Sequence, residues 1–248
     1  MKSLLLNETE ANFKAFDNDW RAEMAAVSVE LAKGSAVYLA SYRRLVSLQA
    51  WRSFLETRIS DGSLAFFLEA QNDALTSHVF ANLGSWRSAL KALRGCIDNV
   101  LYCLYYKDHA VELHLWHEGK HKLTFAEHFT YLDNHPDRVQ VPQIDAMPVL
   151  RAEYATLSKA VHASAKSFRM THDIKQTLLW SDANEQRGKW QTREQVVILH
   201  INLCLLTLFR HELAGAASPA LRDAIGLAVP ASRFSDIKTH MNVIVRKP

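Results

Sequence analysis

Glycine and proline are scarce in this chain. Only 8 glycines and 6 prolines occur in 248 residues, whereas β-sandwiches and β-barrels need many tight turns that these residues supply. Their scarcity disfavours an all-β architecture and favours helices. The hydrophobic content of 48% and charged content of 22% are ordinary for a soluble globular protein.

Cysteine is equally rare, with Cys96, Cys103 and Cys204 the three in the chain. They form no CxxC pair and have no metal-ligand spacing, which predicts buried free thiols in a reducing compartment. The opening residues "MKSLLLNETE" contain too short an apolar stretch for a signal peptide. We therefore expect a cytoplasmic location.

Long apolar runs and phosphate-binding loops are also missing. The longest apolar run, residues 196–209, contains His200 and Asn202 and is shorter than the roughly 18 residues that cross a bilayer. It predicts a buried core helix and no membrane contact. Neither GxxxxGK[ST], GxGxxG nor GxSxG occurs, so we expect no cofactor. A net charge of +3 limits any nucleic-acid contact to a local patch.

Helical periodicity fills most of the chain. Residues 8–33 carry apolar side chains at three- and four-residue spacing, which predicts a helix with one buried face. These are Phe13, Phe16, Trp20, Met24, Val27 and Leu31. Gly34 separates this helix from a second one over 35–59. The pattern predicts an N-terminal helical hairpin in residues 1–60 and a helical bundle with a C-terminal tail in residues 61–248.

Capping patterns divide the bundle. Ser63 is expected to cap a helix that ends near Leu83, and Thr124 with Glu127 forms a capping box. Residues 192–195, "TREQ", are expected to cap the apolar helix. The stretch 171–191 before it is rich in turn residues and predicts an irregular or hairpin excursion. The fold class is therefore all-α.

Two helices carry candidate functional residues. In residues 86–107, Arg94 and Asp98 are four apart and can form an ion pair. In residues 157–170, "LSKAVHASAKSFRM", an apolar line lies beside a basic line. The basic line consists of Lys159, His162, Lys166 and Arg169.

The basic line has a possible chemical role. Cations hold phosphate, and imidazole moves protons near neutral pH, so His162 is the candidate acid or base, and Lys159, Lys166 and Arg169 are candidate phosphate ligands. Arg94, tethered by Asp98, could complete the site from the facing helix. A basic flank is also typical of any amphipathic helix, because lysine stems cover apolar surface.

Three histidines form a separate pattern. His114, His117 and His121 share one face if their helix is continuous, and imidazoles there could ligate zinc. Gly119 weakens that helix, and no second segment supplies ligands. A solvated connecting segment is the alternative interpretation.

The stretches "RSALKALRGCIDNVLYCLYYKDH" and "YATLSKAVHASAKS" resemble the HEPN superfamily (higher eukaryotes and prokaryotes nucleotide-binding) over residues 63–215. The resemblance implies a helical bundle of the kind found in ribonucleases of phage defence and toxin–antitoxin systems. Such proteins dimerise and bring two Arg-x4–6-His motifs into one RNA-cutting cleft.

The chain departs from that motif. His162 suits the family's histidine, but Ala155, Thr156 and Leu157 occupy the positions of the arginine. Arg151 is too far away. Two Arg-x6-His matches elsewhere, Arg193–His200 and Arg233–His240, are of the frequency expected by chance.

Three function classes therefore stay open. The first is a HEPN-like protein that binds RNA or a nucleotide, with possible metal-independent endoribonuclease activity and a homodimer or protein partner. The second is a non-catalytic helical interaction or scaffold subunit of a larger assembly. The third is a metal-dependent hydrolase that uses the histidines of residues 114–121.

Overall fold

The chain folds as an all-α helical bundle, as the sequence predicts. We describe a computed structural model that covers residues 4–162, 168, 171–173, 176–177, 184–214 and 219–247. Its helices are α1 (Leu4–Ala32), α2 (Ser35–Leu55), α3 (Asp61–Asn82), α4 (Trp86–Tyr106), α5 (Ala110–His117), α6 (Phe125–Asp133), α7 (Pro136–Val139), α8 (Met147–Val161), α9 (Asn184–Leu208), α10 (Arg210–Leu213), α11 (Pro219–Ala228) and α12 (Phe234–Met241), with short 3-10 helices η1 (Pro142–Ile144) and η3 (Ala231–Arg233).

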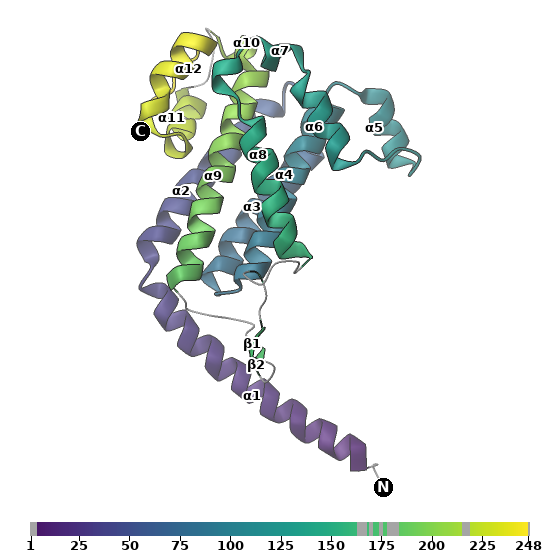
Figure 1. The fold of residues 1–248 in the computed structure, drawn as a ribbon, viewed down its shortest axis with the longest axis vertical. Coiled ribbons are helices and arrows are strands. Elements are labelled where there is room, and N and C mark those ends of the chain that lie inside the picture. Colours follow the sequence, from purple (N-terminus) through teal and green to yellow (C-terminus); the bar gives the residue numbers. More distant parts are fainter. Residues whose placement is uncertain are drawn as a thin grey trace.

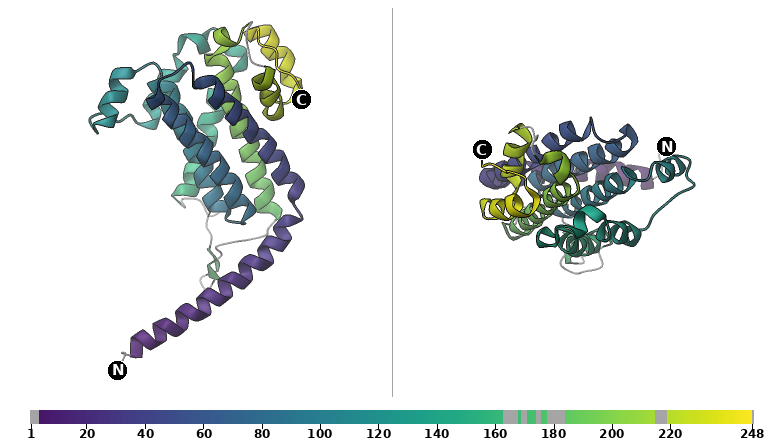
Figure 2. Two further views of the ribbon diagram at one scale, coloured as in Figure 1. Left: turned by 180° about the vertical axis from the view of Figure 1, so that it is seen from behind. Right: turned by 90° about the horizontal axis from the view of Figure 1, so that it is seen from above.

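The long helices α2, α3, α4, α8 and α9 run side by side (Figures 1 and 2). The helices α10, α11 and α12 lie at one end of this bundle, and α1 projects from the other end (Figure 1). The division into residues 1–60 and 61–248 stays a prediction. Of the two helices in residues 1–60, α2 packs against α3, α9 and α11 within the bundle, whereas α1 extends beyond it.

The core lies around α9, whose apolar residues face several neighbours. Among the largest fully buried side chains are Trp51, Trp190, Tyr106 and Phe67. The indole of Trp51 donates a hydrogen bond to Asn202 at 2.9 Å, which satisfies both polar groups inside the core. The predicted buried core helix is confirmed. None of the described helices combines the length and hydropathy that a membrane span requires.

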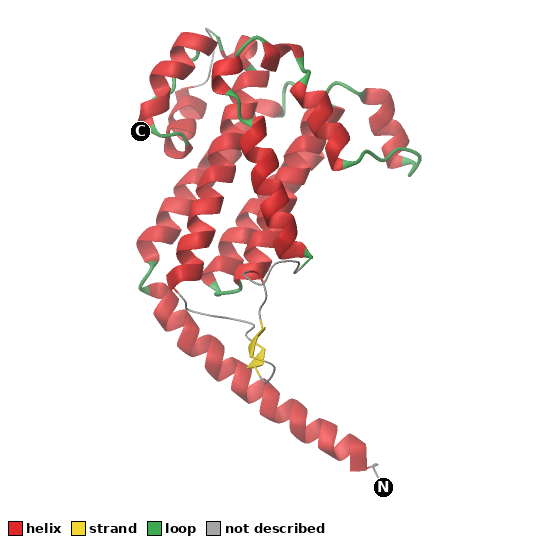
Figure 3. Ribbon diagram, in the orientation of Figure 1, coloured by secondary structure: helices red, strands yellow, loops and turns green. Residues whose placement is uncertain are grey.

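A short hairpin interrupts the helices in the predicted region. Strands β1 (Thr171–Asp173) and β2 (Gln176–Thr177) pair antiparallel, with Thr171 opposite Thr177 and Asp173 opposite Gln176 (Figure 3). The prediction of an excursion is confirmed, but its extent was wrong, because α9 begins at Asn184.

Two of the three predicted caps were wrong or misplaced. Thr192 lies inside α9, where its hydroxyl donates to the Gly188 carbonyl at 3.0 Å. The N-cap of α3 is Ser60, whose hydroxyl accepts from the Ser63 amide at 3.3 Å. The capping box of Thr124 and Glu127 is confirmed.

The apolar stripe of α1 is the largest departure from expectation. Of the residues in α1, Leu31 is the buried one, and the side chains of Phe13 and Phe16 are 64% and 54% exposed. The prediction that this stripe packs in a core was therefore wrong for the outer part of the helix.

Candidate functional site

Arg94 and Asp98 lie where α4 faces α8. Their ion pair is confirmed, with Arg94 Nη1 3.5 Å from Asp98 Oδ2. Arg94 also reaches across to α8: Nε donates to the Ser158 hydroxyl at 3.2 Å, and Nη2 donates to the Tyr154 hydroxyl. The guanidinium carbon lies 4.6 Å from the centroid of the Tyr154 ring. We call this contact region, formed by Arg94, Asp98, Tyr154 and Ser158, the α4–α8 seam.

The seam shifts the proton affinity of its carboxyl group. Burial raises the pKa of Asp98 to about 6, although Arg94 and the Tyr154 hydroxyl act in the opposite direction. Burial also raises the pKa of Tyr154, which keeps its hydroxyl protonated. The seam is still partly open, since the side chains of Arg94 and Asp98 are 25% and 24% exposed. A carboxyl group that titrates near neutral pH beside a cation is a typical acid–base candidate.

A second carboxyl group supports the seam from α3. The carboxylate of Asp73 accepts a hydrogen bond from the Asn99 amide at 2.9 Å, and burial raises its pKa. Its charge contributes to the raised pKa of Asp98. The seam therefore has its own carboxyl group on α4, with the carboxyl group of Asp73 near it on α3.

The end of α8 is fixed by another arginine of α4. Arg87 Nε donates to the Ala160 carbonyl at 2.9 Å, and Nη2 donates to the Val161 carbonyl at 3.2 Å. These carbonyls are among the last of α8, which ends at Val161 with His162 as its C-cap. The prediction of one helix through residue 170 was wrong, because Arg87 satisfies carbonyl groups that a longer helix would bond internally.

The structure describes only two of the four residues of the predicted basic line. Lys159 lies in the last turn of α8, and both Lys159 and His162 are exposed. Lys166 and Arg169 lie outside the described residues. His162 is eight residues beyond Tyr154 and four beyond Ser158, which corresponds to rises of about 12 Å and about 6 Å along a helix. It lies at one end of the seam, while Asp98 lies beside Arg94.

The three histidines around α5 do not share a face. Helix α5 ends at His117, and Gly119 has a φ of +71°, which turns the chain before His121. His114 contacts Glu118 at 3.2 Å, whereas His121 contacts the Tyr106 hydroxyl at 3.3 Å. Among the described residues no group of three or more metal-ligating side chains is found. The geometry gives no support to a metal site here.

The Arg-x6-His pair in α9 is structural. Arg193 donates to Glu153 of α8 at 2.8 Å, and His200 bonds the Val196 carbonyl at 2.7 Å. Burial lowers the pKa of His200. His200 is therefore a half-buried histidine whose ring is hydrogen-bonded within α9.

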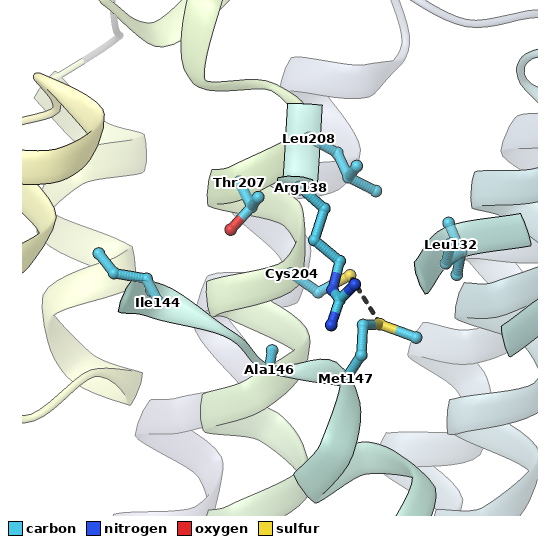
Figure 4. A pocket seen from close by; sticks show the side chains of 8 residues that line it. All are labelled: Leu132, Arg138, Ile144, Ala146, Met147, Cys204, Thr207 and Leu208. Atoms are coloured by element: carbon cyan, nitrogen blue, oxygen red, sulfur yellow. Dashed lines mark hydrogen bonds between the residues drawn. The ribbon is translucent and has the colours of Figure 1, made fainter. Parts of the chain in front are cut away.

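An apolar cavity near the other end of α8 is too small for a substrate. It measures about 10 Å³, roughly the space of one water molecule. Figure 4 shows the side chains that line it, including Cys204 and Met147, whose sulfur atoms are 3.8 Å apart. All three cysteines are buried free thiols, as predicted.

Sequence reasoning missed Tyr154 and Ser158 as members of the seam, and Arg87 as the residue that binds the end of α8. Tyr154 and Ser158 are four apart and so share a helix face, but their partner Arg94 is 60 and 64 residues away. No local pattern links the two segments. The polar contact of Tyr154 is made by its hydroxyl group alone.

The chain matches no protein-family model, no curated protein and no solved structure at a significant level. The resemblance to the HEPN superfamily and a cytoplasmic location therefore stay predictions. Any function has to be inferred from the seam itself.

Proposed function

We propose that this protein binds RNA at the α4–α8 seam and cleaves it without a metal ion, as a HEPN-like endoribonuclease of the phage-defence or toxin–antitoxin kind. The observation that carries the proposal is the Arg94 guanidinium held against Asp98, a carboxyl group whose pKa burial raises to about 6. A guanidinium suits the oxygens of a phosphodiester. A carboxyl group with a pKa near neutrality suits proton transfer.

The proposed reaction is an internal transfer of the phosphoryl group. Asp98 accepts the proton of the RNA 2′-hydroxyl, and the 2′-oxygen forms a bond to phosphorus. The bond from phosphorus to the 5′-oxygen breaks, and the leaving oxygen takes a proton from water. The hydroxide left behind takes the proton from Asp98, and the products are a 2′,3′-cyclic phosphate and a free 5′-hydroxyl. Arg94 and the Tyr154 hydroxyl donate to the phosphate oxygens, where negative charge develops in the transition state.

In this arrangement His162 and Lys159 bind the phosphate of a neighbouring nucleotide. Asp98 is favoured over His162 as the base because it contacts Arg94 directly at 3.5 Å, whereas His162 lies about one helical turn beyond Ser158. Both His162 and Lys159 are exposed at the end of α8, so these side chains can contact a strand that runs along the helix.

The experiment is cleavage of single-stranded RNA in a buffer with excess chelator. We expect Asp98→Asn to lower the rate about 100-fold or more, within the range of general base catalysis, and His162→Ala to weaken RNA binding. The matched control is Arg52→Gln, because Arg52 forms an i,i+4 pair with Glu56 at 3.0 Å on α2, away from the seam. Equal rates for Asp98→Asn and the wild type would refute the catalytic role.

The second candidate function is that of a helical interaction subunit without catalytic activity. The exposed apolar stripe of α1 favours it. A wild-type protein that neither binds nor cleaves RNA would select this candidate.

A further inference from the structure

The apolar stripe of α1 begins inside the protein and continues outside it. Leu31 is 2% exposed and belongs to the core, and Val27 packs against the same core. At about 100° per residue the same face continues outward through Trp20, Phe16, Phe13 and Leu5. The exposed fraction of the side chains rises to 64% at Phe13 and 69% at Leu5.

We expect an exposed apolar stripe of this kind to be covered by a partner. Isolated helices gain little stability from propensity alone, and most of their stability comes from packing of the apolar face. Leu5, Leu6, Phe13 and Phe16 are each more than half exposed. They and the half-buried side chains farther along leave on the order of 500 Å² of apolar surface uncovered.

We propose that α1 pairs in parallel with α1 of a second copy of this chain. Two such stripes would bury about 1,000 Å², which reaches the lower bound for a specific interface. The apolar spacing of three and four residues is the spacing at which two helices pack side by side.

The charged side chains on the two flanks of the stripe favour the parallel orientation. On a helical wheel, Lys14 and Arg21 lie on one flank of the stripe, together with Glu10 and Asp17. The opposite flank carries four acidic residues, which are Glu8, Asp19, Glu23 and Glu30. In a parallel twofold pair the two different flanks meet, so the acidic flank faces a flank whose two cations balance its two carboxylates, with Arg21 paired to Asp17 of the same helix at 3.1 Å. An antiparallel pair would set the acidic flanks against each other, which is destabilising.

The parallel pair also fits the position of α1 in the molecule. The inner end of α1 joins the bundle, and the outer end is far from it (Figure 2). The helices can therefore pair along their outer part, with both bundles at the same end. The dimer is independent of the proposed RNA cleavage, and the two can fail separately.

The first test is sedimentation equilibrium of the full chain. We expect a dimer for the wild type and an increase in the dissociation constant of about 100-fold or more for Phe13→Glu with Phe16→Glu. The matched control, Ala15→Glu with Asn18→Glu, adds the same charge on the opposite face and should stay dimeric. A monomeric wild type at about 100 µM, or equal weakening by the control, would overturn the proposal.

Cross-linking tests the orientation even if the charged variant loses its helix. Thr9 lies within the stripe, and in a parallel pair it meets Thr9 of the other copy. We expect Thr9→Cys to form a disulfide-linked dimer on mild oxidation and Asn18→Cys, on the opposite face, to stay monomeric on a denaturing gel. The native cysteines are buried. Cross-linking at position 18 and none at position 9 would contradict the parallel pair.

Discussion

Gly95 of α4 lies directly against the carboxylate of Asp73 on α3. A Cβ atom at position 95 would stand 2.5 Å from Asp73 Oδ2 and 3.0 Å from its Cγ. Asp73 has little freedom to move away, because Asn99 donates to the same oxygen. Glycine in the middle of a helix is usually destabilising, so here the close approach of the two helices explains its presence.

Replacing this glycine should reverse the usual effect of such a change. We expect Gly95→Ala to lower the free energy of unfolding by about 1 kcal/mol, since the clash outweighs the gain in helix propensity. Gly188 of α9 is the matched control, because a Cβ atom there would have no neighbour within 4 Å. Gly188→Ala should stabilise by roughly 0.5–1 kcal/mol. Urea unfolding followed by circular dichroism measures both, and a stabilising Gly95→Ala would contradict this expectation.

A buried ion pair connects α2 and α9. Arg44 Nε donates to Glu194 Oε2 at 2.8 Å, and Ser41 donates to Oε1 at 3.2 Å. The side chains of Arg44 and Glu194 are 9% and 1% exposed. Burial raises the pKa of Glu194 even with Arg44 beside it.

Removing one member of this pair should lower the free energy of unfolding more than removing both members. Arg44→Met leaves a buried carboxylate without its cation, and we expect a loss of about 3–5 kcal/mol in the free energy of unfolding. Arg44→Met combined with Glu194→Leu should recover most of that loss. The measurement is chemical denaturation of the two variants at neutral pH. Additive losses in the double variant would show that the pair does not act as a unit.

The sequence is sufficient to predict elements whose stability depends on neighbours along the chain. The Thr124–Glu127 capping box, the Arg94–Asp98 pair and the burial of residues 196–209 all depend on spacings within one helix. The same kind of local pattern failed at Thr192. Helix α9 continues for eight residues before it, and Trp190 within that extension is buried and bonds Ser77 of α3.

Features set by contacts between distant segments could not be predicted. The end of α8 depends on Arg87, which precedes the carbonyls it binds by more than 70 residues. The polar contacts of Tyr154 and Ser158 depend on Arg94 in the same way. The stripe of α1 shows a further limit: periodicity predicts that a face is buried, but it does not tell whether the covering surface belongs to the same chain.

The contact of Arg87 with the end of α8 should be measurable by itself. We expect Arg87→Met to lower the free energy of unfolding by about 1–2 kcal/mol, because two carbonyl groups lose their donor. Amide exchange should become faster in the last turn of α8 and stay unchanged in α2. Arg52→Met, at an exposed pair, should change stability by less than about 0.5 kcal/mol. Unchanged exchange in the last turn of α8 would contradict the capping role.

The raised pKa of Asp98 predicts a dependence of stability on pH. Since the pKa in the folded chain is about 6 and the ordinary value is 3.8, the folded chain holds the proton more tightly than the unfolded chain. The stability gained from this group is fully present below about pH 4 and is lost as the pH rises through 6. Asp98→Asn carries no titrating proton there. The free energy of unfolding of this variant, measured relative to the wild type, should therefore increase by about 2–3 kcal/mol between pH 4 and pH 8. Urea unfolding of both proteins at several pH values measures the difference, and a difference that is flat or falls with pH would show that Asp98 is not a buried acid of this kind.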